Sequence, residues 1–273
     1  MQITLEKIAN NLKKIEEKRP LIHALTNEIS VNDVANAILA IGGSPTMAHH
    51  MEEVVEFSRR ADCLLINLGA TEYLNEIYEA CKVSYVKKVF DPVGVAASTF
   101  RRDIALNIIE EFRPQVIRGN SSEIIALAHK RSTARGVDED LSIGIGFEEL
   151  QDLVMDFAKE SQAIVVCSGK TDIISDGKEI YTIDNGSSMM KKITGSGCMS
   201  TGIIASFFAV NPTFESVLQA SLFIALSGEL AEKLTLDQDG GSGSFKINFM
   251  DSLFNFSKWC LGLKIKMKKL PKR

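Results

Sequence analysis

Residues 86–123, VKKVFDPVGVAASTFRRDIALNIIEEFRPQVIRGNSSE, contain the pattern that decides the fold. A short apolar run at residues 88–90 is followed by a helix-like stretch at 101–112 and by a second apolar run at 115–117. Strand, helix and strand in this order are typical of two parallel strands joined by a crossover helix. Further strand-like runs precede and follow this unit, at residues 21–25, 63–66 and 163–167. The alternation predicts an α/β fold whose parallel sheet is covered on both faces.

The remaining elements follow from local signals. We expect Ser30 to cap a helix that Gly42 and Gly43 end. Asp176-Gly177 lies between two apolar arms within residues 173–183 and predicts a hairpin. Residues 131–146 are expected to form a surface loop and residues 240–243 a flexible, glycine-rich loop. Other helices are expected near residues 52–60, 72–86, 122–130, 148–159, 198–209, 214–234 and 249–260.

Length and composition indicate one large globular domain, residues 1–273. Apolar residues make up 45% of the 273 residues and charged residues 24%. The sequence has no apolar run near the roughly 20 residues that span a bilayer, so we expect no membrane association. Residues 1–18 lack the apolar core of a secretion signal. The five cysteines are scattered without a Cys-x-x-Cys pair, which predicts neither a zinc site nor disulfides and favours a reducing cytoplasm.

Charge is distributed unevenly along the chain. The net charge is −4, with 31 basic and 35 acidic residues. Six basic residues lie in the tail at 264–273, so the rest carries 31 − 6 = 25 basic against 35 acidic residues. Such a body is expected to repel nucleic acid. The tail is expected to be a frayed, solvated terminus, with a nucleic-acid or membrane patch as the alternative.

Polar and glycine residues gather where the predicted strands end. In doubly wound α/β folds, ligands bind beyond the carboxyl ends of the strands. This rule predicts a binding site from the segments 26–27, 67–69, 91–94, 118–123 and 168–169.

The segment Thr194-Gly-Ser-Gly-Cys198 precedes an apolar run and predicts the start of a buried helix. Free N–H groups and the helix dipole at such a start can hold an anion, although a tight turn gives the same pattern. At this position the dipole is expected to lower the pKa of the Cys198 thiol, which could then accept the proton of a substrate hydroxyl. The alternative for Cys198 is a small buried thiol.

Asp91 and Glu123 follow different strands at the same predicted edge. Two acids placed this way could share one hydrated Mg²⁺ that bridges ATP phosphates. Asp91 could instead belong to a strand-ending turn, and Glu123 could form a capping box with Asn120. Arg118 is interpreted as a phosphate clamp or as a surface charge, and His23 as a core residue of its strand.

The ordered set of motifs resembles the hydroxyethylthiazole kinase family. The motifs are residues 23–27, 32–36, 43–48, 65–69, 91–94, 118–123, 136–138, 194–198 and 243–245, and the resemblance covers residues 20–254. It implies a ribokinase-like three-layer sandwich with a central, mostly parallel sheet. It also implies Mg²⁺-dependent transfer of the ATP γ-phosphoryl group to 5-(2-hydroxyethyl)-4-methylthiazole in thiamine salvage. A homotrimer with active sites between subunits is implied as well.

The same resemblance implies roles for individual residues. The thiazole pocket would be shaped by Asn27, Met47, Gly69 and Gly195. The nucleotide would be contacted by Arg118, Asn120 and Ser168, and Mg²⁺ would be linked to Asp91 and Glu123. The anion hole would be formed by Gly195, Ser196 and Gly197, and Cys198 would be the catalytic residue. The sequence departs from the family pattern at residues 95–98, which are less glycine-rich, and at Ser242, where proline is common.

Two other functions fit the same fold. A nucleotide-dependent dehydratase of hydrated nicotinamide cofactors would need an aspartate in place of Cys198 and a roomier pocket. A non-catalytic thiazole or nucleotide sensor would have no use for a proton acceptor. Kinase activity requires that the turn at Gly195 and the carboxylates of Asp91 and Glu123 converge.

Overall fold

The computed structural model describes residues 3–131 and 145–271. These residues form a nine-stranded sheet with the order β2-β1-β3-β4-β5-β6-β7-β8-β9. Strands β1 to β6 run parallel, whereas β7, β8 and β9 each run antiparallel to their neighbour. The sheet is therefore mostly parallel with an antiparallel wing, as the alternating sequence pattern predicts. The strands are β1 (Leu21–Leu25), β2 (Ser44–Thr46), β3 (Cys63–Asn67), β4 (Lys87–Asp91), β5 (Val116–Asn120), β6 (Ile164–Ser168), β7 (Asp172–Ser175), β8 (Ile180–Ile183) and β9 (Met267–Lys269).

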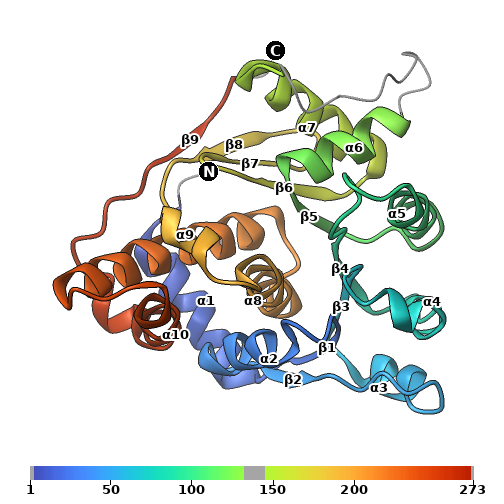
Figure 1. The fold of residues 1–273 in the computed structure, drawn as a ribbon, viewed down its shortest axis with the longest axis horizontal. Coiled ribbons are helices and arrows are strands. Elements are labelled where there is room, and N and C mark those ends of the chain that lie inside the picture. The colour runs from blue at the N-terminus through green and yellow to red at the C-terminus, as the bar shows by residue number, and fades with distance from the viewer. Residues whose placement is uncertain (1–2, 132–144, 272–273) are drawn as a thin grey trace.

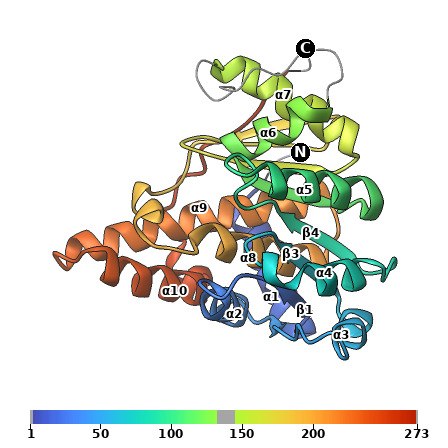
Figure 2. The ribbon, with the colours of Figure 1, turned by 45° about the vertical axis from the view of Figure 1, so that its right-hand side comes forward.

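Helices cover both faces of the sheet and complete three layers (Figures 1 and 2). One layer packs around a core that includes Phe207, Phe223 and Phe256. Its helices are α1 (Leu5–Lys18), α2 (Val31–Ala40), α8 (Ser196–Val210), α9 (Phe214–Asp237) and α10 (Ser242–Trp259). The other layer packs around Phe90 and Phe157. Its helices are α3 (Val54–Arg60), α4 (Leu74–Cys81), α5 (Thr99–Phe112), α6 (Ser121–Arg131) and α7 (Phe147–Ser161).

Helix α8 lies at the centre of its layer and packs against the middle of the sheet. It contacts β1, β3 and β4 beneath it and α1, α2 and α9 beside it. Residues 198–209 are all buried, so both the sheet and the neighbouring helices surround the helix. This explains why its sequence is apolar all round, without an amphipathic stripe. The first turn of α8 is thereby held at the carboxyl ends of the central strands.

Helix α9 is also a core helix. Among the described residues, it is the helix with the length and apolar composition of a membrane span, and 78% of its most apolar stretch is buried inside the molecule.

Several expected elements differ in their bounds or their caps. Ser30 stands at the N-cap of α2, but its hydroxyl makes no capping hydrogen bond; instead its backbone N–H donates to Asn27 Oδ1 at 3.1 Å. The expected helix at 72–86 is shorter, because a 3₁₀ turn η1 (Thr71–Tyr73) precedes α4 and the helix ends at Cys81. Strand β2 was not expected. The hairpin around Asp176-Gly177 is confirmed as β7–β8, with Gly177 at φ +78°.

Two loop expectations are corrected. Residues 240–243 are not wholly a flexible loop, since α10 begins at Ser242. The tail is not simply frayed, because Met267, Lys268 and Lys269 form β9 and pair with β8. The alternation of lysines with Ile265, Met267 and Leu270 is the strand signal that the charge of the tail obscured. The expected loop at 131–146 and the motif at 136–138 fall mostly or wholly outside the described residues.

Candidate functional site

The ends of β3 and β4 bring Asn67 and Asp91 together. They are partners in the parallel ladder, and both side chains are buried. Asn67 Nδ2 donates to Asp91 Oδ2 at 2.9 Å, and Thr201 Oγ1 on α8 lies 2.9 Å from the same oxygen. Burial raises the pKa of Asp91 to about 6; the Arg118 charge opposes the shift and the Glu123 charge adds to it. Burial thus disfavours the charged form of this carboxylate, and a nearby cation would stabilise it.

Cys198 lies in the first turn of α8 and faces the same cluster. Its sulfur accepts N–H groups from Asn67 at 3.2 Å and from Asn27 at 3.6 Å. Burial raises the pKa of Cys198, and the charge of Asp91 raises it further. The expectation that the helix dipole lowers this pKa is therefore wrong for the ligand-free protein. The reason is that a thiol 9% exposed loses the hydration that would stabilise its thiolate.

Glu123 joins the site through the capping box that the sequence indicated. Asn120 N–H donates to Glu123 Oε2 at 2.9 Å, and Glu123 N–H donates to Asn120 Oδ1 at 3.0 Å. The second carboxylate oxygen accepts the Gly94 N–H at 3.0 Å. Glu123 thus ties the start of α6 to the turn after Asp91 while its charge acts on Asp91. The capping interpretation is confirmed, and it leaves the carboxylate at the strand edge.

Arg118 is directed at the first turn of α8 and is not a surface charge. Its Nη1 lies 2.8 Å from the position that a Cβ atom on Gly197 would occupy. A side chain there would displace the guanidinium, so glycine is needed for the close approach. Gly195, at φ +76°, ends the preceding turn in the left-handed region that glycine tolerates. The backbone N–H groups of residues 196–198 precede the first hydrogen-bonded turn of α8 and are available to an anion.

The positions expected to shape the substrate pocket lie on one side of Cys198. A Cβ atom on Gly69 would lie 2.7 Å from both Asn27 Nδ2 and Asn67 Oδ1, so a larger residue would displace these amides. Met47 is half-buried directly after β2 and packs on the core that includes Cys198.

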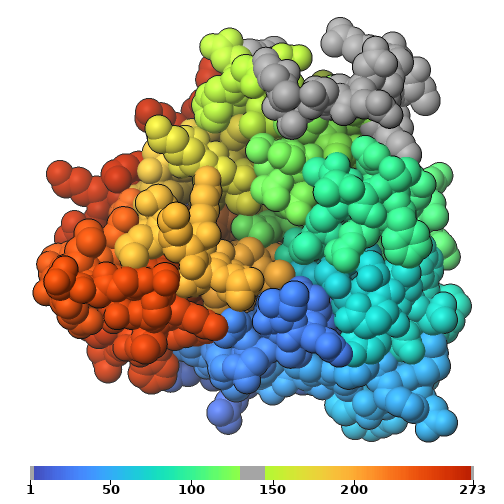
Figure 3. Space-filling view, viewed as in Figure 1, coloured from blue at the N-terminus to red at the C-terminus, as the bar shows by residue number. Residues whose placement is uncertain are grey.

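The remaining predicted residues lie on the other side, around the end of β6. Ser168 ends β6 opposite Asn120, and its hydroxyl donates to the Gly119 carbonyl at 3.2 Å. Asn120 is exposed and Ser196 is half-buried. On the face shown in Figure 3, the segments around α2 (blue), before α8 (gold) and around β5 and α6 (green) meet. The predicted positions thus lie around one junction at the carboxyl ends of the parallel strands.

Sequence reasoning did not assign a role to Asn67 or Thr201. The sequence pointed to Asn67 only through its place in a segment that follows a predicted strand. Thr201 follows Cys198 by three residues, the spacing that places both on one helix face, but an apolar helix gave no reason to single it out.

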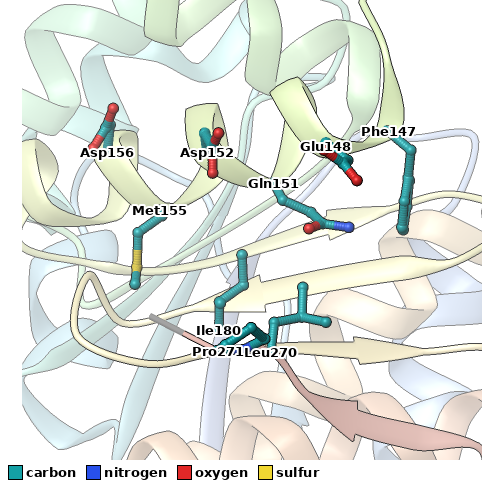
Figure 4. Close-up of a pocket in the computed structure, with 9 residues that line it drawn as sticks. All are labelled: Phe147, Glu148, Gln151, Asp152, Met155, Asp156, Ile180, Leu270 and Pro271. Atoms are coloured by element: carbon teal, nitrogen blue, oxygen red, sulfur yellow. The ribbon is translucent and has the colours of Figure 1, made fainter. Parts of the chain in front are cut away.

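A second hollow lies far from this junction, between α7 and the antiparallel wing (Figure 4). This groove has a volume of about 540 Å³, an apolar floor and an acidic rim. Met155, Ile180 and Leu270 line the floor, and Glu148, Asp152 and Asp156 lie on α7.

Comparison with known proteins decides between the interpretations of the junction. A profile described as "Hydroxyethylthiazole kinase family" matches residues 12–258. The chain belongs to this family. "Hydroxyethylthiazole kinase 2" of Methanosphaera stadtmanae is 40% identical over 269 residues, covering 93% of this chain and 95% of that protein. "Hydroxyethylthiazole kinase" of Thermoanaerobacter sp. strain X514 is 40% identical over 252 residues, covering 90% and 94%.

Solved structures agree with the family and the fold. A hydroxyethylthiazole kinase protein from Pyrococcus horikoshii OT3 superposes with a TM-score of 0.85 at 30% identity, covering 97% of this chain and all of that one. A ribokinase-like superfamily protein from Enterococcus faecalis V583, at 14% identity and a TM-score of 0.60, shares the fold alone. The fold is therefore ribokinase-like, as the resemblance implied. The dehydratase and sensor interpretations find no support among these relatives.

Because the chain belongs to the hydroxyethylthiazole kinase family, the junction can be compared with what a kinase site needs. A kinase site needs an anion-binding turn and acidic residues that face one nucleotide, and the turn at Gly195, Asp91 at the end of β4 and Glu123 in the first turn of α6 are the candidates. Arg118 already links the two halves, because it approaches Gly197 and its charge acts on Asp91.

Proposed function

We propose that this hydroxyethylthiazole kinase transfers the γ-phosphoryl group of ATP directly to the hydroxyethyl oxygen of 5-(2-hydroxyethyl)-4-methylthiazole. The observation that carries the proposal is the contact between the first turn of α8 and the acid at the end of β4, made through Asn67 and Thr201. In phosphoryl transfer, positioning and charge neutralisation dominate catalysis. The first turn of α8, Arg118 and two acidic residues at the same junction supply both the positioning and the charge neutralisation.

The residues at the junction have distinct parts in this reaction. The free N–H groups of residues 196–198 hold the transferring phosphoryl group, and Arg118 neutralises part of its charge. Arg118, Asn120 and Ser168 contact the nucleotide. Asn27, Met47, Gly69 and Gly195 shape the thiazole pocket. The substrate oxygen bonds to phosphorus as the bond from phosphorus to ADP breaks, and ADP leaves with the electron pair.

Cys198 orients the substrate hydroxyl and receives its proton. To receive this proton the sulfur must first lose its own, and burial, which raises the pKa of the thiol, opposes that loss. A strong base is not required, since the loose transition state needs the proton removed only late. The amides of Asn27 and Asn67 both donate to the sulfur and favour its charged form.

Asp91 and Glu123 fit a hydrated Mg²⁺. No group of three or more His, Cys, Asp or Glu side chains is placed to hold a metal within residues 3–131 and 145–271. Mg²⁺ does not require one, because it favours one or two carboxylates together with waters and substrate phosphates. Asp91 is buried with a raised pKa, and Glu123 contributes to that shift, so the pair has negative charge that a cation offsets. When bound, Mg²⁺ supplies positive charge to the phosphates.

A cytoplasmic homotrimer with active sites between subunits completes the proposal. All five cysteines are free and buried, which suits a reducing compartment. Ile29 lies two residues after Asn27 and is 78% exposed, so one large apolar side chain stands at the surface beside the junction. A partner subunit placed there would cover this side chain and enclose the substrate pocket.

The proposal is tested by assaying the purified protein with three alcohols. ADP release and phosphorylated product are measured with ATP and Mg²⁺ plus the thiazole alcohol, an aminopyrimidine alcohol or pyridoxal. We expect the highest kcat/KM with the thiazole alcohol. A preference for either other alcohol, or ATP hydrolysis without a phosphorylated product, would contradict the assignment.

A further inference from the structure

Asn67 makes contact with both reactive groups of the junction. It is the last residue of β3 and has no exposed surface. Its Nδ2 donates one N–H to Asp91 Oδ2 at 2.9 Å and the other to Cys198 Sγ at 3.2 Å. One planar amide group therefore sets the direction of the carboxylate and of the sulfur relative to each other.

The oxygen of the same amide is also fully used. Oδ1 accepts the Gly69 N–H at 2.8 Å and Asn27 Nδ2 at 3.2 Å. Two donated and two accepted hydrogen bonds exhaust what an asparagine side chain offers. A flipped amide would place its oxygen against the Asp91 carboxylate and its NH₂ against the Gly69 N–H. The network thus fixes one orientation of Asn67.

We propose that Asn67 is a positioning residue of the phosphoryl-transfer step, which holds Cys198 Sγ and the Asp91 carboxylate at a fixed separation. The inference rests on the proposed kinase function. Asn67 is fully buried, and its NH₂ group touches Asp91 and Cys198, so we expect the loss of these two donated bonds to act on turnover. Displacement of catalytic groups by about 1 Å can cost roughly 10²-fold in rate.

The variant Asn67→Asp tests the role with the smallest change in shape. It replaces the NH₂ group by an oxygen, so two donated hydrogen bonds become repulsive contacts with Asp91 and the sulfur. The two bonds accepted by Oδ1 remain. We expect kcat to fall by about 10²-fold while KM for ATP and for the thiazole alcohol each stay within about threefold.

Asn185→Asp is the matched control. Asn185 is also a buried asparagine, it donates to a carboxylate oxygen of Glu229 at 3.1 Å, and its Oδ1 accepts the Lys266 N–H at 2.7 Å. The control introduces the same conflict of charges beside the antiparallel wing, away from the junction. We expect a similar loss of thermal stability for both variants and a kcat close to that of the wild type for Asn185→Asp.

The outcomes separate the inference from the proposed function. Equal kcat for Asn67→Asp and Asn185→Asp, or a raised KM with unchanged kcat, would overturn the positioning role while leaving the kinase assignment intact. No turnover by the wild-type protein would overturn the proposed function and the positioning role with it. If Asn67→Asp does not fold, Asn67→Ser removes the donations to Asp91 and Cys198 together with the bonds accepted from Gly69 and Asn27, without adding charge. A fall in kcat larger than that of Asn185→Ser then supports the positioning role, and equal kcat values overturn it.

Discussion

At the scale of single residues, the site depends on side chains whose hydrogen bonds are nearly all satisfied inside the protein. Asp91, Asn67 and Thr201 are buried, and Asn67 and Thr201 both donate to the Asp91 carboxylate. Glu123 accepts backbone N–H groups with both of its oxygens. Such a network is rigid, because a broken bond would leave a polar group unsatisfied in a dry place. Rigidity at this scale is what a reaction catalysed by positioning needs.

Replacement of Glu123 by alanine removes a helix cap and a charge that we propose lies close to Mg²⁺. We expect kcat to fall by about 10²–10³-fold, the usual cost of losing a preorganised electrostatic group. Steady-state rates over a range of Mg²⁺ concentrations provide the measurement. Thr213→Ala serves as a control because Thr213 caps α9, accepting the Ser216 N–H at 3.2 Å, away from the junction. Near-wild-type turnover of Glu123→Ala at saturating Mg²⁺ would contradict the metal assignment.

Replacements of Cys198 distinguish a proton acceptor from a packing thiol. Cys198→Ala should lower kcat, whereas Cys198→Asp should retain activity, since a carboxylate in this place can also accept the hydroxyl proton. Single-turnover rates with the thiazole alcohol measure the chemical step directly. Cys260→Ala removes another buried thiol outside the junction and controls for the loss of a thiol in general. Equal single-turnover rates for Cys198→Ala and the wild type would refute the role.

His23 makes the stability of the protein depend on pH. Its Nδ1 lies 2.9 Å from Ser58 Oγ and its Nε2 lies 2.6 Å from the Ala48 carbonyl, inside β1. Burial lowers the pKa of His23, so the folded state binds fewer protons than the unfolded state. The stabilisation is therefore present above about pH 6.5, the unfolded value, and is lost as the pH falls through the folded pKa.

We expect the urea midpoint of the wild type to fall more between about pH 7.5 and 5.5 than that of His23→Gln, which cannot titrate. Other titrating groups, Asp91 among them, are common to both proteins, so the difference between them reports His23. Equal decreases in the two midpoints would show that His23 does not contribute.

At the scale of elements, the basic tail contains a strand, β9, that its charged sequence did not predict. β9 pairs with β8, the Leu270 N–H donates to the Ile180 carbonyl at 3.0 Å, and the Asp184 N–H donates to the Lys266 carbonyl at 2.8 Å. Lys269 also pairs with Glu179. The segment covers the edge of the antiparallel wing, where an unpaired strand would invite association with other chains.

Deletion of residues 266–273 should destabilise the protein without affecting the chemical step. Several backbone hydrogen bonds are lost at about 0.5–1.5 kcal/mol each, so we expect a loss of at least about 2 kcal/mol in the free energy of unfolding. Denaturant unfolding measures the loss, and kcat at low temperature should remain near that of the wild type. Lys268→Gln, at an exposed site, keeps the strand and removes one charge, so it should unfold like the wild type. Unchanged stability of the truncated protein would mean that β9 adds nothing.

At the scale of the whole molecule, two cores hold the two helix layers against one sheet, and the junction lies where both layers reach the strand ends. α8 comes from one layer and α6 from the other, and Arg118 spans the space between their first turns. The exposed side chain of Ile29 lies near the same place in the chain. The proposed trimer would therefore complete the site that the two layers begin.

Activity should depend on protein concentration if the substrate pocket lies between subunits. We expect a trimer by light scattering and a fall in specific activity on dilution below the dissociation constant, because dissociation exposes the pocket. Ile29→Asp should move both the dissociation of the trimer and the fall in specific activity to higher protein concentration. A monomer with full specific activity at all concentrations would exclude the shared site.

The sequence by itself determined the class of fold, the alternation of strands and helices along the chain, the hairpin, and the candidate segments for the site. Periodicity and turn residues are local properties, and the rule that ligands bind beyond strand ends turns them into a short set of candidate segments. The capping box of Asn120 and Glu123 was readable for the same reason, since it spans only four residues.

The tertiary structure alone decided the contacts between distant segments. The bonds from Asn67 to Asp91 and Cys198 join residues 24 and 131 positions apart. Burial likewise decided the pKa of Cys198: the dipole of α8 is visible in the sequence, but the loss of hydration around the thiol is not. Desolvation depends on how every neighbouring element packs, which is why local sequence could not give its sign.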